Sequence, residues 1–281
     1  MTLLPGFAGP AARRAIEQAA DDPEHLVRQG AASALDVVEP DVRLRVAAHL
    51  LDDPVRAERS EAAMPLADVA PGAMTQAQRI AFDRALDEFF EAQWANAERP
   101  EAHVNLGLMH VKRGELEAAR RSYEGALRVG PWFVPAYANL ADLLRMQDRD
   151  AEGEKVLREG LEAHPTSAAL HHALGPLHVR EKRLDEAIAE LRRAAELTPA
   201  DPQVAYVLAI GLHSTGESEE ALAVLEAAHE RSPAARMLLV ALVTLNRDRG
   251  ALDEARSWAR KLVDLSPGDG GARRLLAELG G

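Results

Sequence analysis

The chain has 281 residues, of which 47% are hydrophobic and 28% are charged, and its formal net charge is −12. The excess of acidic residues disfavours a broad nucleic-acid-binding face and adsorption to an anionic membrane. Cysteine is absent, which excludes disulfides, thiolate metal sites and covalently attached haem within this chain.

The first ten residues are apolar, but prolines and glycines interrupt them and they carry no basic side chain. We therefore expect no signal peptide in this segment. No later run of about 18 apolar residues predicts membrane insertion. The compartment stays open: the cytoplasm is the default, and the periplasm applies if the chain is a fragment of a larger secreted protein.

Four short helices are predicted in the first seventy residues, at about 9–20, 23–38, 40–51 and 54–69. An acidic residue followed by proline marks the start of the last three, as Asp22-Pro23, Glu39-Pro40 and Asp53-Pro54. The same three helices each carry a Val-Arg pair followed by two alanines, at Val27-Arg28, Val42-Arg43 and Val55-Arg56. This pattern resembles HEAT repeats, so residues 1–71 are expected to form short helical hairpins, with a break at residues 70–73.

A longer helix is predicted from Thr75 to Ala97, with Thr75 as its N-cap. Beyond it, prolines recur every 34 residues, at positions 131, 165, 199, 233 and 267. Twenty-four residues before these prolines stand mostly small residues: Gly107, Ala141, Gly175, Ala209 and Val243. Eight residues before them stand mostly large ones: Tyr123, Leu157, Leu191, Leu225 and Ala259.

This period and pattern resemble the tetratricopeptide repeat (TPR), a helix–turn–helix unit of 34 residues. The resemblance implies five repeats over residues 100–269, a capping half repeat at 75–99 and a C-terminal capping helix at 270–281. The fifth repeat departs most, because Val243 and Leu262 occupy small slots and Ala259 a large one. Pro176 is expected to kink its helix locally. The expected fold is therefore all-α: a right-handed α-solenoid of TPR units preceded by HEAT-like hairpins.

No motif predicts an enzyme or a cofactor site. Glycine-rich phosphate loops and nucleophile elbows are absent, and no strands are predicted to hold them. His171 and His178 share one helix face but lie about 10.5 Å apart at the helical rise, too far for one metal ion. His103 and His110 repeat the same two slots. We interpret these histidines as packing residues, and expect no catalytic, cofactor-binding or metal-binding residue.

In the family that the chain resembles, the first helix of each repeat lines a concave groove that binds protein partners. Carried over by repeat position, the predicted partner groove comprises Lys112, Asn139, Asp142, Arg145, Met146, His172, Arg180, Tyr206, His213, Val240 and Arg247. Its lining is apolar with basic residues, which favours an extended segment with apolar side chains and a few carboxylates. Alternatively, the basic residues pair with Asp142, Glu181 or Asp248 and stay solvated. The clamp that binds chaperone tails is unsupported, since only Asn139 matches it.

The leading hypothesis is a non-enzymatic scaffold that binds a peptide segment or a partner domain, and neither nucleic acid nor membrane. The alternative is an accessory or structural module of a larger assembly. HEAT-like hairpins followed by TPR units are similar to the C-terminal part of some bacterial multihaem cytochromes, although this chain has no haem motif. Self-association is a further possibility, through the fifth repeat or through Phe89, Phe90 and Trp94. An enzyme built from histidines and carboxylates is the least favoured interpretation.

Overall fold

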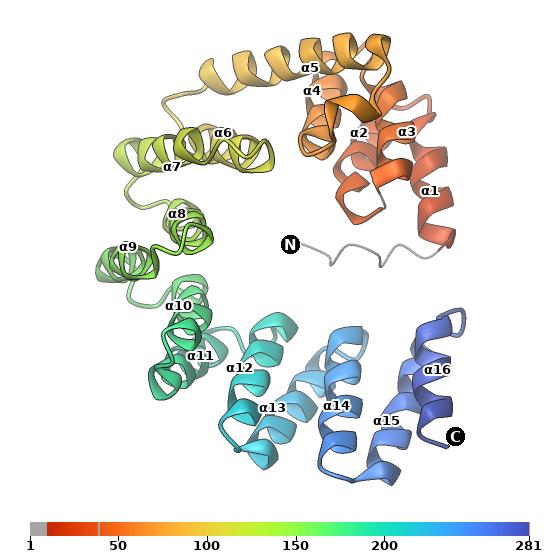
Figure 1. Cartoon of the computed structure of the whole chain (residues 1–281), viewed down its shortest axis with the longest axis vertical. Helices are drawn as coiled ribbons and strands as arrows, with labels where there is room; N and C mark the ends of the chain where they lie inside the picture. The colour runs from red at the N-terminus through yellow and green to blue at the C-terminus, as the bar shows by residue number, and fades with distance from the viewer. Residues whose placement is uncertain (1–9, 39, 281) are drawn as a thin grey trace. The chain divides into compact units, whose positions relative to one another are not determined.

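The computed structural model describes residues 10–38 and 40–280, which form helices, short turns and no strand (Figure 1). The all-α prediction is therefore confirmed over these residues. They fall into two compact units, the first ending at Ala136 and the second beginning at Tyr137. Residues 1–9, on which the signal-peptide expectation rests, lie outside the described residues, as does Gly281.

The first unit begins with the four short helices that the sequence predicts. They are α1 (Pro10–Ala20), α2 (His25–Ser33), α3 (Pro40–Leu50) and α4 (Arg56–Ala63). Single 3₁₀ turns follow α2 and α4, as η1 (Leu35–Val37) and η2 (Met64–Leu66), and η3 (Pro71–Ala73) comes next. The predicted limits at 38 and 69 are therefore too long for the α-helices proper, because each ends in a tighter turn.

Three longer helices complete the first unit: α5 (Gln76–Trp94), α6 (Pro100–Lys112) and α7 (Leu116–Val129). Thr75 caps α5 as predicted. Its hydroxyl accepts a hydrogen bond from the Gln78 backbone N–H at 3.2 Å, and the Gln78 side chain accepts one from the Thr75 N–H at 2.9 Å. This reciprocal capping box satisfies two backbone donors at the helix start.

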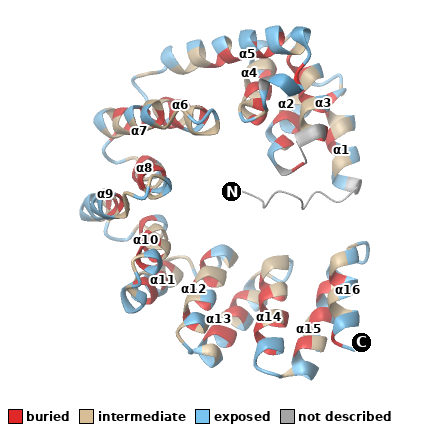
Figure 2. Cartoon of the chain, in the orientation of Figure 1, coloured by how far each residue is buried: buried red, intermediate tan, exposed pale blue. Residues whose placement is uncertain are grey.

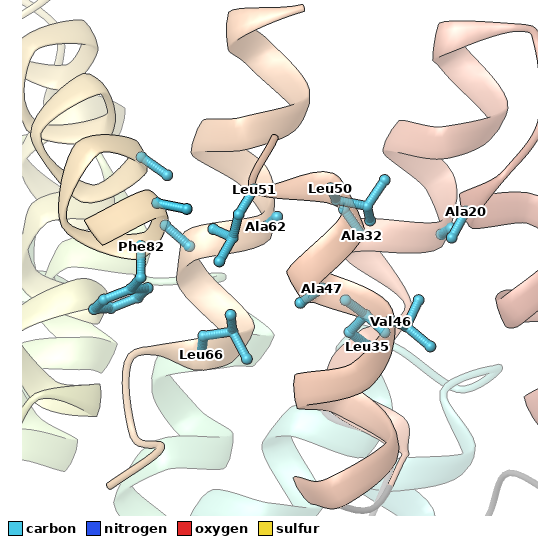
Figure 3. Packing of buried hydrophobic residues seen from close by; sticks show 14 of the residues in the cluster. Ala20, Ala32, Leu35, Val46, Ala47, Leu50, Leu51, Ala62, Leu66 and Phe82 are labelled. Atoms are coloured by element: carbon cyan, nitrogen blue, oxygen red, sulfur yellow. The ribbon is translucent and has the colours of Figure 1, made fainter. Parts of the chain in front are cut away.

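One hydrophobic core joins α5 to the short helices. It contains buried residues from Ile16 to Phe89 and also Met109 of α6. Figure 3 shows part of it, with Ala32, Leu50 and Leu66 from the short elements and Phe82 from α5. The core thus continues across residues 70–73, where the sequence predicts a break between modules.

A repeated arginine contact organises the short helices. Arg28 donates to Asp53 Oδ2 at 2.6 Å and to the carbonyl of Asp22 at 2.8 Å. Thirty-one residues later, Arg59 donates to the Glu88 carboxylate at 2.6 Å and to the carbonyl of Asp53 at 2.7 Å. The two segments therefore align with a shift of 31 residues. In each, Asp-Pro is followed by an arginine six residues after the aspartate. The Val-Arg pairs suggested a different register, which places Arg56 where Arg59 belongs.

The second unit holds the remaining hairpins and a final helix, except that the first three residues of the first of these helices belong to the first unit. They are α8 (Val134–Met146), α9 (Asp150–Ala163), α10 (Ala168–Arg180), α11 (Leu184–Leu197), α12 (Pro202–Ser214), α13 (Ser218–Arg231), α14 (Arg236–Asp248), α15 (Leu252–Leu265) and α16 (Gly270–Glu278). From α6 onward, successive first helices start 34 residues apart, and each periodic proline stands two residues after a second helix ends. Pro176 lies inside α10 without ending it. The predicted period is confirmed, and each hairpin buries part of its surface (Figure 2).

The small and large slots face each other within a hairpin. A Cβ added at Gly175 of α10 would lie 2.5 Å from Leu191 Cγ of α11, and one at Gly107 of α6 would overlap the Tyr123 ring of α7. In the fifth repeat the sizes are exchanged, and Val243 and Ala259 are both fully buried in one cluster. The departure seen in the sequence is therefore a swap that keeps the pair's combined volume similar.

The turn inside each repeat needs a left-handed backbone. Gly114, Gly216 and Gly250 have φ values of 73°, 90° and 81°, and Asp148 and Lys182 adopt 56° and 61° in the same slot. Glycine occupies this region without strain, whereas other residues adopt it at a cost in free energy. The fold thus imposes one turn geometry on all five repeats, whatever residue fills the slot.

Among the described residues, no helix combines the length and the apolar character that crossing a bilayer requires.

We expect Gly175→Ala to destabilise the second unit by about 1 kcal/mol or more, because the new methyl group overpacks against Leu191. Gly211→Ala is the matched control, since its Cβ would lie at an ordinary 3.6 Å from Leu191 Cδ1. This variant should gain up to about 1 kcal/mol from helix propensity. Urea denaturation followed by circular dichroism gives the free energy of unfolding of both variants. Equal changes in the two variants would contradict the close approach of α10 and α11 at Gly175.

We expect Asp53→Asn to destabilise the first unit by about 3 kcal/mol, because it strands the guanidinium of Arg28 beside a largely buried neutral group. The hydrogen bond from Arg28 lowers the pKa of Asp53 below its ordinary value. The unfolded chain therefore takes up a proton first on acidification, and the stabilisation present at neutral pH is lost progressively below about pH 4.

Asp52→Asn is the control for this measurement, because Asp52 pairs with Arg84 at the surface and is 72% exposed. Denaturant titrations at pH 7 and pH 3 compare the two variants with the parent chain. The difference in free energy of unfolding between the parent chain and Asp53→Asn should be smaller at pH 3 than at pH 7. A larger difference at pH 3 would refute the stabilising ion pair between Asp53 and Arg28.

Candidate functional site

Exposed apolar side chains stand on several first helices. In the second unit, α8, α10 and α12 expose Met146, Val179 and Ile210, with exposures of 55%, 42% and 40%, and in the first unit α6 exposes Leu108, at 38%. Each occupies a position that the repeat pattern assigns to the groove. An apolar side chain held at the surface on several successive repeats is a feature of interaction surfaces.

The eleven predicted groove residues all lie in the described part of the chain, and every one is at least partly exposed. Asp142, Met146, Arg180 and Arg247 are the most accessible, whereas Tyr206 and Val240 are half-buried. Positions five, nine and twelve of a repeat share one helix face, which brings Tyr206, Ile210 and His213 onto a common side of α12. We call the part of this surface on α8, α10, α12 and α14 the first-helix face.

The basic residues of the predicted groove are all engaged by acidic partners. In the first unit, Lys112 donates to Asp36 at 2.6 Å. In the second unit, Arg145 pairs with Asp142 at 3.1 Å and Arg247 with Asp248 at 3.1 Å. The positive charge expected from the sequence is therefore compensated locally, as the alternative interpretation proposed.

Arg180 also has acidic partners, but not the expected Glu181. It donates to Asp148 at 2.7 Å, in the turn of the preceding repeat, and to Asp150 at 3.1 Å, at the start of α9. Asp148 is reachable because it occupies the left-handed turn position. Such exposed pairs contribute about 0–1 kcal/mol each, so they hold the arginine side chains only weakly.

The histidines of the first-helix face differ in their contacts. His213 Nδ1 lies 2.9 Å from the Ser218 hydroxyl. His172 Nε2 is buried without a hydrogen-bond partner among the described residues. Burial lowers the pKa of His172, against the opposing charges of Asp201 and Asp142.

Three of the four histidines interpreted from the sequence as packing residues have hydrogen-bond partners. His110 Nδ1 lies 2.6 Å from Glu115, His171 Nδ1 lies 2.6 Å from Glu190, and His103 Nε2 lies 2.9 Å from the Ala97 carbonyl. Each contact stays within one repeat or joins it to the turn that precedes α6. These three side chains are packing residues that satisfy nearby backbone or carboxylate groups.

His178 differs from them. It is 0% exposed, and neither ring nitrogen has a hydrogen-bond partner in the part of the chain that the structure describes. Donor atoms of His178, Glu154 and Glu181 all lie within 4.8 Å of one another. Sequence reasoning missed this group because it compared histidines along one helix only. The His-x-x-Glu spacing of residues 178–181 was the available signal.

Two models of the tetratricopeptide repeat family match the chain. One covers residues 110–177, and the other covers 75–131, 172–235 and 206–270, which is more than half of the sequence. The chain belongs to the tetratricopeptide repeat family. The matches begin at residue 75, so the short helices α1–α4 lie outside them.

Curated TPR relatives match only over part of their length. Human tetratricopeptide repeat protein 7B is 31% identical over 97 residues, covering 34% of this chain and 11% of that protein. Human protein O-mannosyl-transferase TMTC3 is 27% identical over 117 residues, covering 41% of this chain and 13% of that protein. The chain thus spans roughly a tenth of the curated relatives it matches, and one of them is named as a transferase.

Solved structures show the same fold. PilF of Pseudomonas aeruginosa superposes with a TM-score of 0.51 at 20% identity, covering 79% of this chain and 99% of that one. A thermophilic TPR protein of Thermus thermophilus gives 0.50 at 21% identity, covering 64% and 98%. TPR proteins are generally scaffolds for protein interactions.

Proposed function

We propose that this TPR protein is a non-enzymatic scaffold that binds an extended, largely apolar segment of a partner protein on the first-helix face. The exposed apolar side chains Met146, Val179 and Ile210 carry the proposal, since they stand at groove positions on three consecutive repeats. These side chains are already about half buried, so a partner that covers one of them gains about 1 kcal/mol. Three such anchors contribute about 3 kcal/mol, and the other contacts of the bound segment along the face supply the remaining binding energy.

The charges on this face refine the chemistry of the partner. Arg145, Arg180 and Arg247 already have acidic neighbours, so these arginines offer no uncompensated positive charge. Because exposed ion pairs are weak, a carboxylate of the partner can replace an aspartate at small cost. The apolar anchors therefore supply the affinity, and the arginines select where acidic side chains of the bound segment lie. Nothing in this chemistry favours nucleic acid or a membrane.

A second candidate function is an accessory module of a larger assembly. The curated relatives contain the matching TPR region as a small share of a much longer protein. The short helices α1–α4, which resemble HEAT repeats in sequence, add a second helical segment on one core with α5. In that role the chain would dock other domains, and self-association through Trp94 or the fifth repeat is one form of it.

We expect Val179→Glu and Ile210→Glu to weaken peptide binding at least tenfold each, because each places a carboxylate where an apolar anchor is buried. Peptides of twelve residues are first selected from a random display library on the parent chain. Fluorescence anisotropy with the selected peptide then compares the variants. Circular dichroism confirms that each variant keeps its helix content.

Leu252→Glu is the matched control, because Leu252 is 48% exposed and starts the second helix α15. It introduces the same carboxylate outside the first-helix face and should bind the peptide like the parent chain. Selection of no peptide, or equal losses in all three variants, would overturn the proposed face.

A further inference from the structure

A buried histidine faces two carboxylates at the junction of the second and third repeats. Glu154 lies on α9, His178 on α10, and Glu181 immediately after α10. Their donor atoms lie within 4.8 Å of one another. In a tetrahedral zinc site, ligand atoms about 2.1 Å from the metal are about 3.4 Å apart. Side-chain rotations that move these donor atoms by about 1 Å would therefore bring them to the separation found in a zinc site.

The environment of His178 needs an explanation. Burying a polar group without a hydrogen bond is costly, and buried side chains nearly always find a partner. Here both ring nitrogens lack one among the described residues, although the side chain is 0% exposed. Burial and the charges of Arg183 and Arg158 lower the pKa of His178, against the opposing charges of Glu154 and Glu186. Metal coordination would give one of these ring nitrogens a partner, since a neutral imidazole is the form that coordinates a metal.

The guanidinium of Arg183 provides the positive charge beside the two carboxylates of this cluster. Its guanidinium is paired with both Glu154 and Glu181, and it reaches Glu186 at 2.9 Å. Arg158 pairs with Glu154 at 2.6 Å. Three carboxylates thus face two guanidinium groups, which leaves one negative charge in excess. The arrangement satisfies the carboxylates but provides nothing for His178.

We propose that Glu154, His178 and Glu181 bind a divalent transition-metal ion of the zinc type in exchange for Arg183. One imidazole nitrogen and two carboxylate oxygens form a donor set that suits zinc, and the chain has no thiolate to compete for it. Arg183 keeps Glu186 as its partner when it leaves the other two carboxylates. The ion would clamp the second repeat to the third, independently of the first-helix face.

Zinc titration of the full chain by isothermal calorimetry tests this site. We expect one equivalent to bind the parent chain, with affinity at least tenfold lower in Glu181→Gln. Arg183→Gln should raise the affinity at least tenfold, because it removes the competing cation. Cobalt(II) gives a second readout, a visible absorption band that is present in the parent chain and lost in Glu181→Gln.

Glu186→Gln is the matched control, since it removes a carboxylate that Arg183 contacts but that lies outside the ligand group. Its zinc affinity should equal that of the parent chain. His178→Ala is a further variant, used only if circular dichroism shows that it folds. The proposal fails if neither the parent chain nor Arg183→Gln binds zinc at 1:1 stoichiometry, or if Glu181→Gln binds it as tightly as the parent.

Discussion

The close approach of the two helices within each repeat is the constraint on which the rest of the structure depends. A small residue on the first helix admits a large one from the second, as at Gly175 and Leu191. The fifth repeat keeps the contact with the sizes exchanged, at Val243 and Ala259. The fold therefore constrains the joint volume of the pair, and the residue class at either position alone is secondary.

This contact also explains why a first-helix face is available for binding. Each first helix buries its small residue against its own partner helix and further residues against the next hairpin. The remaining side of the first helix does not pack against the core. Met146, Val179 and Ile210 are therefore exposed there without loss of core packing. Apolar residues at such positions are unfavourable for solubility and useful for recognition.

Sequence alone located the repeats to within a residue or two, because glycine, alanine and proline at a fixed period are strong one-dimensional signals. The same period assigned the groove positions, whose role in binding stays a prediction. It did not find the partner of Lys112, because Asp36 lies 76 residues away and only tertiary structure brings the two together. It also gave the wrong register for the short helices, since the roles of Arg28 and Arg59 depend on carboxylates that neighbouring segments supply.

The surroundings of His178 could not be predicted from spacing along one helix. Helical rise alone predicts that His171 and His178, seven residues apart, do not share a metal. The same rule says nothing of Glu154, which reaches His178 from the preceding repeat. In an array whose repeats contact mainly their neighbours, stability is nearly a sum of local terms. An ion held by two repeats would add a term at one junction alone, so those two repeats would unfold as a unit while the others stayed independent.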